Sequence, residues 1–111
     1  MTTLDRGQIY SRFNDVVNMA PAELDRWLET EPSHKVGFRR NGVGESVGHA
    51  SGRRIVAILH KAKGDLDDDD YAHMRKVVGF VRRHLAQQPQ NMVTSRWRYS
   101  LMNWGHDPIK E

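Results

Sequence analysis

The chain has 111 residues, a net charge of +3, 28% charged residues and no cysteine, which is the size and composition of one small globular domain. The lack of cysteine excludes disulfides, thiol catalysis and cysteine-ligated metal ions. No run of about 18 apolar residues is present, and residues 1–15 lack the basic and apolar regions of a signal peptide, so we expect a single cytoplasmic domain over residues 1–111 with no membrane contact.

The charge is divided unevenly along the chain. Residues 34–64 carry seven basic side chains and one acidic one, residues 71–98 carry six basic side chains and no acidic one, and five aspartates lie within residues 65–70. Two basic segments of this kind favour a polyanionic partner. The alternative is that folding places the aspartates against the basic side chains and neutralises them.

Two helices are predicted in the first third of the chain. Apolar residues at helical spacing predict the first over residues 5–18 and the second from Pro21 to Pro32. Their apolar stripes are Ile9, Phe13, Val16 and Val17 in the first, and Leu24, Trp27 and Leu28 in the second. Residues 33–50 contain four glycines and few apolar residues, which predicts a long basic loop that is functional or disordered.

The third helix is predicted over about residues 52–63. Its start is ambiguous, because Ser51 is one candidate N-cap and Ser46 is another, the latter giving a longer helix with Gly48 and Gly52 inside it.

The fourth helix, over residues 68 to about 87, has the clearest signal. Asp67 is a good N-cap and Asp70 three residues later approaches a capping box, so helix capping rather than calcium binding explains the aspartates. A final helix is predicted over residues 95–104, capped by Thr94 and stopped by Gly105. We expect it to dock on the core through Trp97, Leu101 and Trp104. No segment alternates as a strand does, so the predicted fold is all-α, a compact bundle of about five helices with the long loop between the second and third.

The third helix and the loop before it form the candidate nucleic-acid surface. The loop supplies Lys35, Arg39 and Arg40, and the helix supplies Arg53, Arg54, His60 and Lys61. These side chains lie on the side away from the apolar stripe, and the planar arginine fork suits phosphate. The alternative is an ordinary solvated helix face.

A second feature lies on the fourth helix, where Phe80 is flanked by Lys76 and Arg83 on the face opposite the core stripe. Such an aromatic side chain can stack on a nucleic-acid base. The favoured interpretation is that another helix of the same domain, or a dimer mate, covers it.

Several chemistries lack their motifs. His49 and His60 are eleven residues apart, as are His73 and His84, which is about 16 Å along a helix and too far for two ligands of one metal ion. The aspartate run lacks the glycine and glutamate of a calcium loop, and no phosphate loop, dinucleotide fingerprint or nucleophile elbow is present. The sequence therefore predicts a protein that is not an enzyme and has no metal, no cofactor and no small-molecule substrate.

Three strings resemble a small bacterial family classed as domain of unknown function 3140: GHASGRRIV at 48–56, YAHMRKVVG at 71–79 and WRYSLMNWGHDP at 97–108. The likeness extends to the early helix pair, with Val17, Asn18 and Met19 ahead of Leu24, Trp27 and Leu28. Members are commonly labelled candidate DNA-binding proteins, without an established activity, cofactor or set of site residues. The resemblance implies a compact bacterial domain with a DNA partner.

The function expected from the sequence is non-enzymatic binding of double-stranded DNA, mainly through the phosphate backbone and with weak sequence preference. The alternative is a protein–protein adaptor or a self-associating, stress-related protein, for instance a homodimer.

Overall fold

The computed structural model describes residues 5–39, 42–90 and 95–110. Within them the fold is all-α, as predicted, with six α-helices and one 3₁₀ turn. The elements are α1 (Arg6–Val16), α2 (Pro21–Leu28), α3 (Glu31–Lys35), α4 (Val47–Leu59), the 3₁₀ turn η2 (Lys63–Asp65), α5 (Asp68–Leu85) and α6 (Arg96–Asn103).

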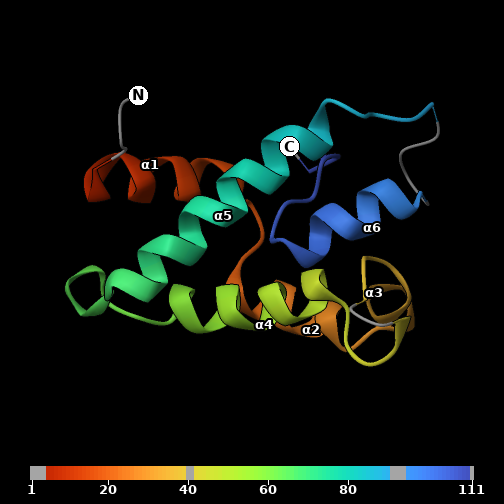
Figure 1. The fold of residues 1–111 in the computed structure, drawn as a ribbon, viewed down its shortest axis with the longest axis horizontal. Helices are drawn as coiled ribbons and strands as arrows, with labels where there is room; N and C mark the ends of the chain where they lie inside the picture. The colour runs from red at the N-terminus through yellow and green to blue at the C-terminus, as the bar shows by residue number, and fades with distance from the viewer. Residues whose placement is uncertain (1–4, 40–41, 91–94, 111) are drawn as a thin grey trace.

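The longest helix, α5, organises the molecule. Figure 1 shows it running diagonally across the fold, with α1 along one side, α4 and α2 on the other, and α6 beside its C-terminal half. The strongest helix pairs are α1 with α5 and α2 with α4, and α6 joins the two pairs by touching α2, α3, α4 and α5. The core draws on α1, α2, α4, α5 and α6, whose largest fully buried apolar side chains are Phe13, Leu24, Ile55, Met74 and Leu101.

The segment predicted as a loop over 33–50 is shorter in the structure. The second helix does not continue to Pro32; it ends at Leu28, and Pro32 lies in the first turn of α3, where a proline has no helical hydrogen bond to lose. Thr30 caps α3 by accepting a hydrogen bond from the Ser33 N–H. At the other end of the segment α4 begins at Val47 with Ser46 as its N-cap, so the longer of the two predicted starts is the correct one.

Two glycines lie inside α4 because neighbouring helices come too close for a side chain. A Cβ on Gly52 would lie 2.5 Å from the Asn103 backbone oxygen and 2.6 Å from Leu28 Cδ2. A Cβ on Gly48 would lie 2.9 Å from Trp104 Nε1. These glycines therefore let α4 approach α2 and α6. Their low helix propensity alone does not predict this role.

The start of α5 forms the predicted capping box. Asp67 Oδ1 accepts from the Asp70 N–H at 2.8 Å, and Asp70 Oδ2 accepts from the Asp67 N–H at 3.1 Å. Both N–H groups would otherwise lack a partner at the helix end.

We expect Asp67→Ala to lower the free energy of unfolding by about 1 kcal/mol, because one orphan N–H of α5 loses its acceptor. Urea denaturation measures this, and Asp69→Ala is the matched control, because Asp69 is exposed in the same turn and is not the cap. Equal midpoints for wild type and Asp67→Ala would contradict the capping role.

The last helix docks as predicted. Leu101 is fully buried, Trp104 is 5% exposed, and the half-buried Trp97 packs against the same core cluster. Gly105 ends the helix with a φ of 83°, a conformation that glycine adopts without strain. The predicted cap, Thr94, lies outside the described residues; the N-cap is Ser95, whose hydroxyl accepts from the Arg98 N–H at 3.1 Å.

Candidate nucleic-acid interface

The residues predicted to contact DNA are largely engaged in contacts within the protein. On α4, Arg53 forms a two-pronged ion pair with Glu45, its Nε lying 2.8 Å from Glu45 Oε2. The same carboxylate contacts the buried ring of His49. The charge of Arg53 is therefore compensated by a carboxylate of the preceding loop.

A buried aspartate compensates two further cations of the predicted surface. Asp70, whose side chain is only 4% exposed, lies 3.2 Å from Arg54 Nη2 and 2.7 Å from Lys61 Nζ. The alternative that folding brings the aspartate run against the basic segment thus holds for this carboxylate. Arg54 and Lys61 help to solvate a charge that the fold has buried.

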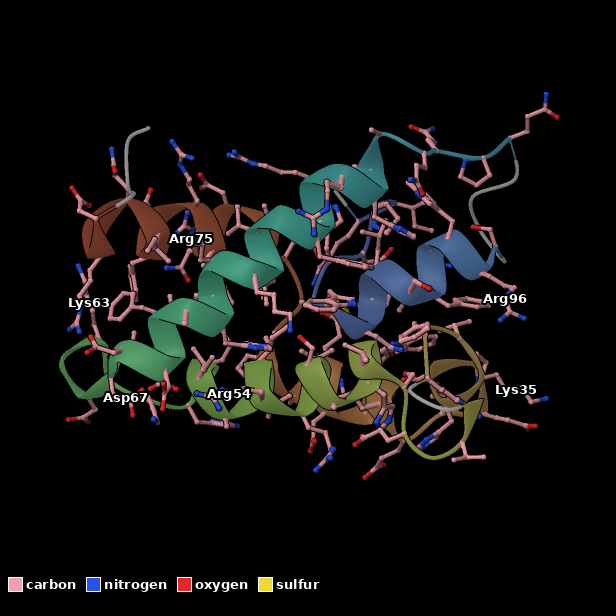
Figure 2. The ribbon with its side chains drawn as sticks, in the orientation of Figure 1. Lys35, Arg54, Lys63, Asp67, Arg75 and Arg96 are labelled. Atoms are coloured by element: carbon pink, nitrogen blue, oxygen red, sulfur yellow. The ribbon has the colours of Figure 1, made fainter. Side chains whose placement is uncertain are left out.

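The remaining predicted residues do not extend this surface. Lys35 Nζ lies 2.8 Å from Glu31 Oε1 within α3, and Arg39 donates to the His34 backbone oxygen. His60 is exposed at the C-cap of α4, and Arg40 lies outside the described residues. In Figure 2 Lys35 lies at the α3 end of the molecule, far from Arg54 beside the start of α5. The structure therefore does not bring the predicted residues into one patch of uncompensated charge.

The carboxylates in these pairs make stability depend on pH. The hydrogen bond from Arg53, with help from His49, lowers the pKa of Glu45 from 4.5 to about 2. The hydrogen bond from Lys61 likewise lowers the pKa of Asp70. Burial lowers the pKa of both His73 and His84. All four groups bind protons more weakly in the folded protein than in the unfolded chain.

We therefore expect stability to fall with acid in two stages. The histidine contribution is lost as the pH drops below about 6.5, and the carboxylate contribution is lost between about pH 4.5 and pH 2. Urea midpoints measured from about pH 7 to pH 3 test this, and Glu45→Gln should flatten the lower stage. A midpoint independent of pH over that range would contradict the pairing.

The exposed face of α5 carries cations that the fold does not compensate. Arg75 and Arg82 form one row, Lys76 and Arg83 form a second, and the small Ala72 and Gly79 lie between the rows. In the described part of the chain none of the four cations has an ion pair or a hydrogen bond. We call this surface, with its four cations, the α5 basic face. Its signal was present in the sequence, because residues 71–98 contain no acidic side chain.

A shallow hollow extends the α5 basic face toward α1. It has a volume of 180 Å³ and is lined by Ile9, Arg12, Arg75, Val78, Gly79 and Arg82. Figure 2 shows Arg75 on the side of α5 that faces α1. Three arginines from two helices therefore surround a floor formed by Ile9, Val78 and Gly79.

Phe80, which lies between Lys76 and Arg83 along α5, packs against another helix of its own domain. The Phe80 ring stacks on Trp104 of α6 with ring centroids 4.3 Å apart. This confirms the interpretation that another helix of the domain packs against Phe80, whose ring stays partly exposed.

Two further features, metal-ion clusters and membrane-spanning helices, were looked for in the described residues. They contain no group of three or more histidine, aspartate or glutamate side chains placed to hold a metal ion. Among the helices described, none combines the length and the apolar character needed to cross a membrane.

Comparison with known proteins places the chain in a family. A family model described as a protein of unknown function, DUF3140, matches residues 12–102. The chain belongs to the DUF3140 family. No curated protein and no solved structure matches it. The matched span holds α2 to α5 whole, and with them the entire α5 basic face.

Proposed function

We propose that this DUF3140 protein binds double-stranded DNA without catalysing a reaction, and that the α5 basic face is its main contact surface. The observation that carries the proposal is the set of four cations, Arg75, Lys76, Arg82 and Arg83, on one exposed helix face without a compensating carboxylate. Such groups are available to pair with a polyanion, and DNA is a polyanion whose phosphates repeat regularly enough to meet two rows of cations.

The pairing pattern favours α5 over the surface predicted on α4. A cation that already holds a carboxylate must break that contact before it can bind a phosphate, and Arg54 and Lys61 would leave Asp70 as an unpaired buried charge. The cations of the α5 basic face have no such contact to break. They therefore offer more binding free energy for each phosphate contact.

The shape of the α5 basic face fits a phosphate backbone. Within each row the two cations are seven residues apart, which is about 10.5 Å along the helix. Ala72 and Gly79 between the rows present little bulk of their own, and the Arg83 guanidinium lies beside Gly79, so a phosphate that approaches between the rows meets a cation there. Because no base-reading motif accompanies the face, most of the affinity should come from phosphates, with weak sequence preference.

The alternative partner is another protein. Self-association through the α5 basic face would place four cations against four cations, which is repulsive, so a homodimer would need a different surface. An acidic protein partner would use the same cations as DNA. The DNA titration described below distinguishes the two partners.

The proposal predicts a steep salt dependence of DNA binding. With four phosphate contacts, the logarithm of the association constant should fall with the logarithm of salt concentration with a slope of about −3.6. Fluorescence anisotropy with two labelled duplexes of unrelated sequence, between about 50 and 200 mM salt, measures it. The two duplexes should bind with similar affinity.

Charge-matched double variants locate the contact. Arg75→Gln/Arg82→Gln should reduce the magnitude of the slope by about 1.8, whereas Lys35→Gln/Arg53→Gln, which removes two ion-paired cations, should change it little. A larger loss in the second variant would assign binding to the α4 side instead. Absence of binding by the wild type at low salt would overturn DNA binding and favour the adaptor.

A further inference from the structure

A cleft lies between the start of α4 and the middle of α5, on the side of α5 away from α1. It consists of two adjoining hollows of 380 and 220 Å³ that share Val47, Lys76 and Trp104 as lining residues. The larger hollow alone is in the size range of small-molecule sites, about 300–1,000 Å³, and the smaller one adjoins it. We call the two hollows together the α4–α5 cleft.

The wall of the α4–α5 cleft contains a hydrogen-bond donor without an acceptor. Trp104 is only 5% exposed, and its indole N–H has no hydrogen-bond partner among the described residues. Gly48 keeps this edge of the indole open, because a Cβ there would lie 2.9 Å from Nε1. Trp104 Nε1 is not a buried atom left without a partner, so water can reach it, and an acceptor atom entering the cleft beside Gly48 would take the place of that water.

Three cations line the same two hollows as Trp104. Lys76 and Arg83 line the smaller hollow, and Arg54 lines the larger one. Lys76 and Arg83 have no partner within the described part of the chain. His73, which also lines the larger hollow, has a pKa lowered by burial and further by the charges of Arg54 and Lys76. The lining carboxylate, Glu45, is occupied by Arg53, so the potential inside the cleft favours an anion.

The lining also includes apolar side chains that are partly uncovered. Phe38 is 73% exposed and Val43 is 72% exposed, and each belongs to the lining of one of the two hollows. Exposed large apolar side chains beside a cavity gain free energy when an apolar body covers them. Phe80, stacked on Trp104, supplies an aromatic surface in the smaller hollow.

We propose that the α4–α5 cleft binds a small organic anion with an aromatic or apolar body and a single carboxylate. The carboxylate accepts from the Trp104 indole N–H and lies between Lys76 and Arg83, while the body packs against Phe38 and Phe80. This site stands independently of DNA binding, although Lys76 and Arg83 belong to both surfaces.

The test uses 2-naphthoate as the probe and 2-naphthalenemethanol as a neutral compound of the same shape, with no DNA present. The readout is the indole N–H signals of the three tryptophans in ¹⁵N-labelled protein, with the Trp104 signal assigned through Trp104→Phe. We expect 2-naphthoate to shift the Trp104 signal saturably with a dissociation constant of roughly 1 mM or below. The neutral compound should bind at least about tenfold more weakly, which corresponds to 1.4 kcal/mol.

Two double variants on the same helix distinguish a site from general attraction. Lys76→Gln/Arg83→Gln should weaken 2-naphthoate binding by about tenfold, whereas Arg75→Gln/Arg82→Gln removes the same charge from the other row and should leave it unchanged. A Trp104 signal that does not move, equal shifts by both compounds, or equal losses in both variants would each overturn the proposal. None of these results would bear on the salt-dependent binding of DNA.

Discussion

Replacing Trp104 by alanine should lower the free energy of unfolding by about 3–5 kcal/mol, the largest loss expected from a single side chain here. The indole is 5% exposed and lies in the core cluster. Its ring stacks on Phe80 at 4.3 Å and lies parallel to His73 at 6.3 Å. Removing it leaves a cavity where α6 meets α4 and α5, so these helices lose their common contact.

Urea denaturation followed by circular dichroism measures the loss. The matched control is Phe38→Ala, which removes another large aromatic side chain from a position that is 73% exposed and should change stability by less than about 0.5 kcal/mol. Unfolding free energies of Trp104→Ala and wild type that agree within error would refute the docking of α6 on the core.

The second large effect is expected at Asn103, which is 1% exposed and links three helices. Its Oδ1 accepts from Trp27 Nε1 at 2.8 Å and from the Ser33 hydroxyl at 2.5 Å, and its Nδ2 donates to the Ser33 backbone oxygen at 3.0 Å. Asn103→Ala leaves two donors and one acceptor unpaired. At about 1–3 kcal/mol for each such group, the loss should be about 3 kcal/mol or more.

The control for this variant is Asn14→Ala, in which the same side chain is lost from an exposed position where its Nδ2 donates to the Tyr10 backbone oxygen. That substitution should change the free energy of unfolding by less than about 0.5 kcal/mol. Adding Ser33→Ala to Asn103→Ala should cost less than the sum of the two single changes, because both remove the same hydrogen bond. Additive losses would show that the two side chains do not act together.

The parts of the fold that could be predicted from sequence are those with local determinants. The start of α5 follows from Asp67 and Asp70, and the end of α6 follows from Gly105, since each signal acts within a few residues. The apolar stripe of α5 likewise fixes which face turns inward.

The start of α4 could not be resolved in the same way. Gly48 and Gly52 favour a loop when judged by propensity, and their reason for lying in a helix is the close approach of Trp104 and Leu28. That reason exists only once α2 and α6 have packed against α4, so no local pattern reveals it.

In the candidate site, too, local features could be predicted from the sequence and tertiary contacts could not. The outward position of Arg53 and Arg54 was predictable from helical spacing, but their partners were not. Asp70 is 16 residues from Arg54 along the chain, and Glu45 is eight from Arg53. Tertiary packing brings these charges together and determines which cations remain available to a partner.

Mapping where DNA contacts the protein is the most direct test of DNA binding by the α5 basic face. In ¹H–¹⁵N correlation spectra of the protein titrated with a short duplex, we predict that the largest shifts fall on residues 72–83 of α5 and on Arg12, while residues 53–61, in α4 and just after it, change little. Shifts concentrated on α4, or none at a salt concentration low enough for phosphate contacts to form, would contradict the assignment of the α5 basic face as the DNA-binding surface.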